Sequence, residues 1–284
     1  MSGRAKVAGV IGWPISHSLS PRLHEFWLRE HEIDGAYVPL PVAPESFAAA
    51  LGGLRTAGFV GVNVTNPHKM AAFALADRAD AAARAAGAAN LLVFGDSAID
   101  VRNTDIEGLT ASLSESLGAD ALRGQSVAIL GAGGAARGAI LALNQLGARE
   151  IRVVTRNYTR ADAVVAQLRA AVPAQLVSTL WSDWPRAAEN ITLLLNASGG
   201  GLAGAAALEI SLDPLPAGAA VCDIVYNPLE TRLLKDARAR GHRTIDGLGM
   251  LMHQAVPAFA AFYGVTPQVT PALRAELEQA LRNG

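Results

Sequence analysis

The sequence has a single cysteine, almost no net charge and no long uncharged apolar run. With Cys222 alone among 284 residues, no disulfide can form within the chain, which is typical of a reducing compartment. A formal net charge of −1 offers no basic surplus for nucleic acid or an anionic membrane. The six histidines are scattered without ligand spacing, so no metal site is predicted. No segment suits a bilayer span or signal peptide, and we expect a cytoplasmic protein.

Hydrophobic residues make up 51% of the chain, and their pattern alternates between strands and helices in its first hundred residues. Ser20 before Pro21, and Asn66 before Pro67, are the expected helix caps. An expected hairpin turns at residues 95–97. The strands expected here are 6–12, 35–42, 59–65, 90–94 and 98–101, and the helices are 20–31, 44–58, one from near Pro67, one ending near Gly87, and 103–116.

The second half begins with one strand–helix–strand unit over residues 125–156, whose parallel strands imply a right-handed crossover. Further strands are expected at 191–198, 219–226 and 243–246, with Cys222 as a small buried residue in one of them. A helix is expected at 231–241, helical structure from Gly247 onward, and a flexible glycine-rich loop at 198–206. The pattern predicts two α/β lobes with a boundary near residues 103–120.

A glycine-rich turn follows the first strand of that unit. Residues 131–136 fit G-x-G-x-x-A between a strand and an apolar helix. In dinucleotide-binding folds the first glycine permits the tight turn, the second admits the pyrophosphate, and a small residue at Ala136 allows close packing. The helix N-terminus adds amide donors for phosphate. The alternative is a turn that binds nothing. The predicted phosphate-binding residues are Gly131, Ala132, Gly133, Gly134 and Ala135.

The end of the next strand indicates which dinucleotide binds. An Asp or Glu there usually meets a free ribose 2′-hydroxyl, whereas here the strand ends in Thr155-Arg156-Asn157 with Arg160 following. Two guanidinium groups suit a 2′-phosphate, so NADP is predicted over NAD. The alternative is that both arginines are solvated surface residues at a helix start.

Polar residues gather at four expected strand ends: Ser18 and Ser20, Asn63 and Thr65, Asn90, and the run 103–105. Ligands bind at the carboxyl ends of parallel strands, and hydroxyls and amides suit a small polyhydroxylated anion. Each residue also has a structural alternative, because Ser20 and Asp105 could be helix caps and Asn90 a turn residue.

Lys69 and Asp105 form the predicted catalytic pair. A lysine in the first turn of a helix is unfavourable for stability, because the helix dipole is positive there. A lysine beside a carboxylate could pass a proton to a carbonyl oxygen as hydride arrives. The alternative is a surface lysine and a capping aspartate that never meet.

Taken together, these motifs resemble those of the shikimate dehydrogenase family, and the resemblance covers nearly the whole chain. The segments that carry the resemblance are SHSLSP, NVTNPHK, GAANLL, RNTD, GAGGAA, TRNYTRA, DIVYNPLETRLL and GLGMLMHQA. NVTNPHK is similar to the highly specific N-V-T-x-P-x-K motif of that family.

The resemblance implies reversible reduction of 3-dehydroshikimate to shikimate by NADPH, with Lys69 and Asp105 as the catalytic pair. Ser18 and Ser20 would hold the carboxylate, and Ile224 and Gly247 would lie near the nicotinamide. It implies substrate binding by residues 1–103, a Rossmann NADP-binding domain at 104–246, and C-terminal helices 247–284 that return to the first lobe. The implied substrate residues are Ser18, Ser20, Asn63, Thr65, Asn90, Tyr226 and Gln254.

Three segments depart from the family pattern. Thr155-Arg156-Asn157 stands for Asn-Arg-Thr, residues 196–199 read Asn-Ala-Ser-Gly for Asn-Ala-Thr-Pro, and Val101 replaces a glycine. The first bears on the preference for NADP over NAD. Two other functions stay open: a dual quinate/shikimate dehydrogenase that uses NAD, and a non-catalytic NADP-binding sensor. The sensor should have lost Lys69 or Asp105, and both are present.

Overall fold

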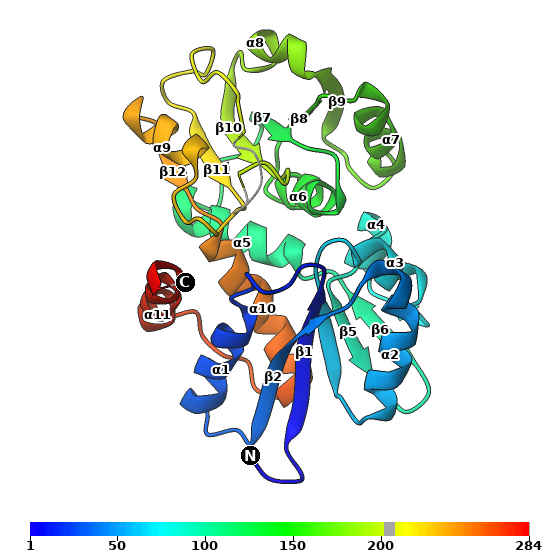
Figure 1. Cartoon of the computed structure of the whole chain (residues 1–284). Helices are drawn as coiled ribbons and strands as arrows, with labels where there is room; N and C mark the ends of the chain where they lie inside the picture. Colours follow the sequence, from blue (N-terminus) through cyan, green and yellow to red (C-terminus); the bar gives the residue numbers. More distant parts are fainter. Residues whose placement is uncertain (202–207, 284) are drawn as a thin grey trace. The chain divides into compact units, whose positions relative to one another are not determined.

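The computed structural model describes residues 1–201 and 208–283, which form two compact units (Figure 1). The first comprises Met1–Thr104 with Met252–Gly284, and the second comprises Asp105–Leu251. Residues 202–207, which belong to the glycine-rich loop expected to be flexible, lie outside the described residues. The expected fold class of two α/β lobes, one of Rossmann type, is confirmed.

The first unit is built on a six-stranded mixed sheet with the order β2-β1-β3-β5-β6-β4. Strand β1 pairs in parallel with β2 and β3, whereas β5 is antiparallel to β3 and β6. The hairpin predicted at residues 95–97 is therefore confirmed as the connection of β5 to β6, while β4 was not predicted. The strands are β1 (Lys6–Gly12), β2 (Gly35–Pro41), β3 (Gly61–Val64), β4 (Arg78–Ala79), β5 (Leu91–Phe94) and β6 (Ile99–Arg102).

Helices cover both faces of this sheet. On one face Val62 and Val64 pack against Phe47 and Leu51 of α2. The neighbouring Gly61 faces the other side, where Phe262 of α10 lies close to it. The helices are α1 (Ser20–Glu30), η1 (Pro44–Ser46), α2 (Phe47–Thr56), α3 (Lys69–Ala74), α4 (Ala81–Ala86), α10 (Leu248–Tyr263, from Met252 on in this unit) and α11 (Pro271–Asn283).

The C-terminal helices return to the first unit, as expected. The Trp27 indole Nε1–H donates to the Gln268 carbonyl at 3.1 Å, and Arg29 pairs with Glu276 at 2.8 Å. Tyr263 donates its hydroxyl to the Ala36 carbonyl at 2.9 Å. These contacts join α1 and β2 to a segment more than two hundred residues later in the chain.

The second unit has a six-stranded sheet with the order β12-β11-β10-β7-β8-β9, and each neighbouring pair is parallel. The unit β7–α6–β8 confirms the strand–helix–strand prediction, and Cys222 lies buried in β11 as expected. The strands are β7 (Ser126–Leu130), β8 (Glu150–Thr155), β9 (Gln175–Leu180), β10 (Ile191–Asn196), β11 (Ala220–Asp223) and β12 (Thr244–Ile245).

Alternate side chains of this sheet build its core. Ala128 and Leu130 face a cluster that includes Trp184 of α8 and Leu233 and Leu234 of α9. The segment between β8 and β10, which contains α7, β9 and α8, was not predicted. The helices are α5 (Asp105–Leu117), α6 (Gly134–Gln145), α7 (Tyr158–Leu168), η2 (Trp181–Asp183), α8 (Trp184–Ala187) and α9 (Arg232–Ala239).

Candidate functional site

The loops that follow β1 and β3 lie side by side in the first unit. The Thr65 N–H donates to the Ile11 carbonyl at 2.8 Å, and the Trp13 N–H donates to the Asn66 carbonyl at 3.2 Å. Because β1 and β3 are parallel, these bonds place both loops at the carboxyl end of the sheet. This is the edge at which ligands bind in α/β folds.

A four-residue turn, rather than the start of a helix, occupies Thr65 to His68. The His68 N–H donates to the Thr65 carbonyl at 2.9 Å, and the Asn66–Pro67 peptide bond is cis. The prediction of Asn66 as cap and Pro67 as first helical residue is wrong, because both residues lie in this turn before the helix. Helix α3 has His68 at its N-cap and begins at Lys69.

Lys69 is fixed through its own backbone and through its neighbour. Its carbonyl accepts a hydrogen bond of 2.9 Å from the Ala89 N–H, directly before Asn90. The His68 ring stacks on Phe47 with centroids 4.6 Å apart, and its Nε2 lies 2.8 Å from the Val42 carbonyl. As predicted, the lysine stands in the first turn of a helix, where the dipole disfavours a cation.

Three of the predicted polar residues, Asn63, Asn90 and Gln254, are brought together in one network. The Asn63 side-chain amide donates to the Asn90 carbonyl at 3.0 Å, and the Asn90 amide donates to Gln254 Oε1 at 3.2 Å. Thr104 completes it, because its N–H donates to Asn90 Oδ1 at 2.7 Å and its hydroxyl donates to the Gln254 carbonyl at 2.9 Å. Paired amides of this kind present fixed donors and acceptors.

Tyr37 also belongs to this network and was missed from the sequence. Its hydroxyl donates to Asn63 Oδ1 at 2.8 Å, and both side chains are buried. The available signal was weak, because a tyrosine in a strand normally indicates packing. The bond orients the Asn63 amide, since it engages the carbonyl oxygen of that side chain.

Ser18 and Ser20 lie together at the start of α1, where the Ser18 hydroxyl accepts a 3.3 Å bond from the Ser20 N–H. The expectation that Ser20 caps the helix is wrong. Leu19 is the N-cap and Ser20 the first helical residue, and the Leu19 side chain makes no capping hydrogen bond. Asp105 is the first residue of α5, and Asp105 and Tyr226 belong to the second unit.

In the second unit, the predicted glycine-rich turn joins β7 to α6. Gly131 has φ +113°, a conformation that L side chains rarely adopt, and its N–H donates to the Val154 carbonyl at 3.0 Å. A Cβ added to Gly133, the N-cap of α6, would meet nothing within 4 Å. Ala136 is fully buried. The turn therefore leaves its outer side open and directs the first amides of α6 outward, which suits a phosphate.

The segment after β8 is ordered by its own side chains. Thr155 Oγ1 accepts from the Asn157 N–H at 3.0 Å, and Asn157 Oδ1 accepts from the Arg160 N–H at 3.2 Å as the cap of α7. In the described part of the chain, neither Arg156 nor Arg160 forms an ion pair with a carboxylate. The segment that carries these two arginines follows β8, the sheet neighbour of β7, which leads into the glycine-rich turn, and such guanidinium groups can stabilise an anion.

The two residues expected near the nicotinamide lie against each other. A Cβ added to Gly247 would be 2.2 Å from the Ile224 carbonyl oxygen, so no larger residue fits without a shift of the backbone. This contact fixes the loop after β11 against the start of α10.

A buried carboxylate supports the same loop. Asp223 accepts from the Asn196 amide at 2.9 Å, the Thr231 hydroxyl at 2.7 Å and the Val225 N–H at 3.1 Å. Burial raises the pKa of Asp223, and these three hydrogen bonds oppose that rise. Sequence reasoning missed Asp223 and Thr231, since a single Asp after an apolar run carries no distinctive signal.

Two kinds of feature are absent from residues 1–201 and 208–283. No helix in this part is long and apolar enough to span a membrane. Likewise, no group of three or more His, Cys, Asp and Glu side chains there could hold a metal ion.

Comparison with known proteins gives matches along the chain. Residues 10–92 match the family model described as the shikimate dehydrogenase substrate binding domain, and residues 113–193 match that described as shikimate / quinate 5-dehydrogenase. The shikimate dehydrogenase (NADP(+)) of Paramagnetospirillum magneticum is 46% identical over 97% of this chain and 99% of its own.

Solved structures are similar over nearly the full length. The shikimate 5-dehydrogenase of Thermus thermophilus, in complex with NADP(H) and shikimate, is 32% identical with a TM-score of 0.83, covering 98% of this chain and 99% of its own. The quinate dehydrogenase of Corynebacterium glutamicum, in complex with NAD, is 28% identical with a TM-score of 0.86 over the same shares of the two chains.

Proposed function

The chain belongs to the shikimate dehydrogenase family, and we propose that Lys69 and Asp105 carry the proton transfer in its NADP-dependent interconversion of 3-dehydroshikimate and shikimate. The reaction belongs to the shikimate pathway of aromatic amino-acid biosynthesis. The proposal rests on the fixed position of Lys69. Its carbonyl accepts a hydrogen bond from the N–H of Ala89, the residue before Asn90, at the edge of the first sheet where ligands bind in α/β folds.

The hydrogen-bonding groups of the first unit suit this substrate. We propose that Ser18 and Ser20 bind the carboxylate, as neutral hydroxyls beside a helix N-terminus can. The amide network holds the side chains of Asn63 and Asn90 in fixed positions for contact with the ring hydroxyls. The residues proposed to contact the substrate are Ser18, Ser20, Asn63, Thr65, Asn90, Tyr226 and Gln254.

NADP fits the residues of the second unit. The open turn at Gly133 and the start of α6 suit the pyrophosphate, with contributions from Gly131, Ala132, Gly134 and Ala135. Arg156 and Arg160 suit the 2′-phosphate, with Thr155 and Asn157 ordering their segment. We further propose that Ile224 and Gly247 border the nicotinamide.

The protein's own part in the chemistry is binding, orientation and movement of a proton. When bound, NADPH supplies the hydride. The Lys69 ammonium donates a proton or hydrogen bond to the carbonyl oxygen of 3-dehydroshikimate, and the Asp105 carboxylate keeps that lysine charged. In the reverse direction the same groups accept the proton of the shikimate hydroxyl. The lysine thus stands at an electrostatically unfavourable helix position because the reaction uses it there.

We also propose what each domain binds, how the chain assembles and where it acts. Residues 1–103 bind the substrate, residues 104–246 bind NADP, and residues 247–284 support the substrate domain. The enzyme acts as a monomer or homodimer without nucleic acid or membrane, which the net charge of −1 supports. The single buried cysteine supports a cytoplasmic location. Light scattering after size-exclusion chromatography measures the mass in solution.

Activity on quinate with NAD is the second candidate reaction. The similarity to the quinate dehydrogenase of Corynebacterium glutamicum favours it. The lack of an acidic residue at Thr155–Asn157, with Arg156 and Arg160 in place, favours NADP instead. The same assay with quinate and NAD distinguishes the two reactions.

The first experiment measures NADP reduction by the purified protein with shikimate, in parallel with NAD and quinate. Wild type should turn over shikimate with NADP, and Lys69→Met should lower kcat by more than about a hundredfold, the usual contribution of a general acid. Lys235→Met, at an exposed lysine of α9, is the matched control and should leave kcat unchanged.

Two results would contradict the proposal. A folded protein that binds NADP but turns over neither shikimate nor quinate lacks the assigned activity. A Lys69→Met variant that keeps kcat within about tenfold of wild type shows that the lysine does not move the proton.

A further inference from the structure

Trp181 lies directly beside the arginine that is assigned to the cofactor phosphate. Strands β8 and β9 are parallel and in register, with Thr155 opposite Leu180 at their ends. Arg156 and Trp181 are therefore the next residues beyond a paired strand end. The Arg156 guanidinium carbon sits over the Trp181 ring, 5.2 Å from its centroid, within the range of a cation–π contact.

The two partners differ in how firmly they are held. Trp181 is partly buried and packs against the core cluster of the second unit, whereas Arg156 is exposed. A long exposed arginine loses considerable rotamer entropy when it must adopt one position for a ligand. Contact with a fixed indole face reduces the number of positions open to the guanidinium group before the ligand arrives.

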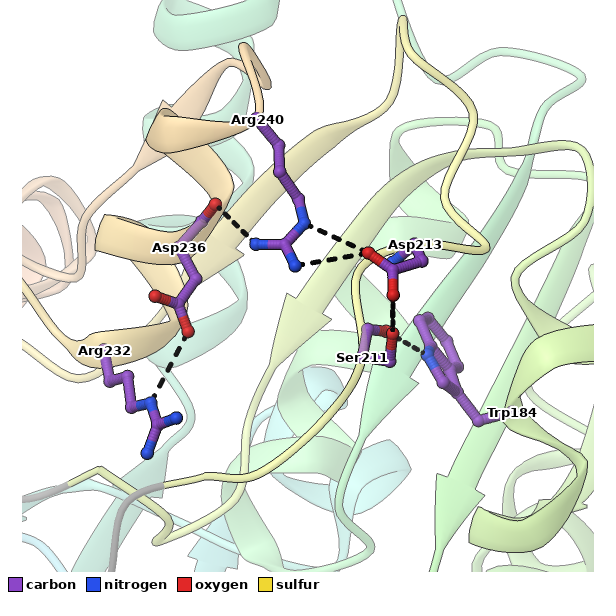
Figure 2. Close-up of polar contacts among 6 residues, drawn as sticks. All are labelled: Trp184, Ser211, Asp213, Arg232, Asp236 and Arg240. Atoms are coloured by element: carbon purple, nitrogen blue, oxygen red, sulfur yellow. Dashed lines mark hydrogen bonds and ion pairs between the residues drawn. The ribbon is translucent and has the colours of Figure 1, made fainter.

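Two other arginines of this unit provide a contrast. Arg232 pairs with Asp236 at 3.5 Å, and Arg240 pairs with Asp213 at 3.2 Å (Figure 2). Arg156 forms no such ion pair within the described residues. Its guanidinium is held by an aromatic face, which leaves the N–H groups at its edges available for an anion.

The hollow beside Trp181 and Trp184 is a less suitable site. It has a volume of about 350 Å³ and is bordered by Trp181, Trp184, Arg232 and Asp236. Its arginine, Arg232, pairs with Asp236 (Figure 2), and Glu209 adds a further negative charge, so an anion is disfavoured there. Arg156 does not border this hollow and pairs with no carboxylate among the described residues, so the anion site belongs with Arg156.

We propose that Trp181 is a positioning residue for the binding of NADP. By holding the Arg156 guanidinium ready for the 2′-phosphate, Trp181 favours NADP over NAD. This inference rests on the assignment of NADP in the proposed function. Trp181 acts through Arg156 and contributes to the choice of cofactor. It has no part in the proton transfer.

The test is calorimetric titration of NADP and of NAD into wild type and Trp181→Leu. The variant should weaken NADP binding about two- to fivefold, the range of an exposed cation–π contact, and leave NAD binding unchanged. Trp181→Phe, which keeps an aromatic face, should recover most of the loss. In an Arg156→Leu background, Trp181→Leu should have no further effect on NADP affinity.

Trp184→Phe is the matched control. Trp184 is buried and its Nε1–H donates to the Ser211 carbonyl at 2.6 Å (Figure 2), so its loss should lower stability without changing the ratio of NADP to NAD affinity. The Trp181→Leu variant should also raise the KM for NADP and keep kcat.

The outcomes separate this inference from the proposed function. Equal losses for NADP and NAD, or an added loss in the Arg156→Leu background, would show a merely structural role and overturn it. Wild type that binds both cofactors equally also overturns it, even if shikimate is turned over. Protein that shows the predicted pattern of affinities without turnover would support this inference and refute the catalytic one.

Discussion

Lowering the pH from 7 to 4.5 should destabilise the first unit through one buried histidine, His24. Its ring is fully buried and stacks on Tyr37, with centroids 3.8 Å apart and planes 5° apart. Trp27, Phe259 and Phe262 surround it, and neither ring nitrogen has a hydrogen-bond partner in the described chain. Burial lowers the pKa of His24 from 6.5 to about 3, because the charged ring would lose its hydration.

The sign and size of the effect follow from proton linkage. Below pH 6.5 the unfolded chain binds a proton at His24, while the folded chain keeps the ring neutral down to about pH 3. The contribution of the neutral His24 ring to stability is therefore complete above pH 6.5, and it is lost progressively as the pH falls from 6.5 to about 3. Because the unfolded chain binds about one more proton than the folded chain over most of this range, the free energy of unfolding should fall by about 2–3 kcal/mol between pH 7 and 4.5.

His24→Phe isolates this term, since phenylalanine has a similar shape and cannot be protonated. Urea unfolding of wild type and variant at pH 7 and pH 4.5 gives the difference in pH sensitivity between them. Other titrating groups contribute to both proteins and cancel. The ring of His24 should also show no titration above pH 4 in its NMR signals. An equal loss of stability in both proteins, or a His24 pKa near 6.5, would refute the reasoning.

Two further predictions concern the loop after β11. Asp223→Ala leaves the buried donors of Asn196 and Thr231 without an acceptor and should cost about 2–4 kcal/mol in urea unfolding, whereas Asp223→Asn keeps an acceptor and should cost less; equal costs would contradict this. Gly247→Ala forces a Cβ against the Ile224 carbonyl and should cost about 1–3 kcal/mol and weaken NADP binding, while Gly218→Ala, with nothing within 4 Å, should do neither.

Local sequence signals predicted the parts of the fold in which the hydrophobic pattern and the residues next to it in the chain indicate the same element. The apolar run Ser126–Leu130, the glycines after it and the helix up to Gln145 together specified one unit, and the structure has it. The caps at Ser20 and Asn66 were predicted wrongly. Helix α1 begins one residue earlier than predicted, with Leu19 as its N-cap. Asn66 lies in a turn before α3, where its carbonyl accepts a long-range bond from the Trp13 N–H.

Local sequence signals did not predict contacts between segments that lie far apart in the chain. Strand β9 has partly exposed residues without clear alternation, so neither it nor Trp181 could be placed. Tyr37 and Asp223 are single residues whose roles arise only when β2 lies near β3 and when β11 meets α9. The polar residues at strand ends were easier to name as candidates, because a strand end can be recognised in the sequence and ligands bind at the carboxyl ends of parallel strands.

The discontinuous first unit has a consequence for synthesis on the ribosome. Its core around Trp27 requires Phe259 and Phe262, which are translated more than two hundred residues later. The second unit, Asp105–Leu251, is continuous and can complete its sheet earlier. The N-terminal part of the nascent chain must therefore wait with one apolar sheet face uncovered. That interval is when a chaperone would be needed, and a chain truncated before residue 252 should aggregate through this face.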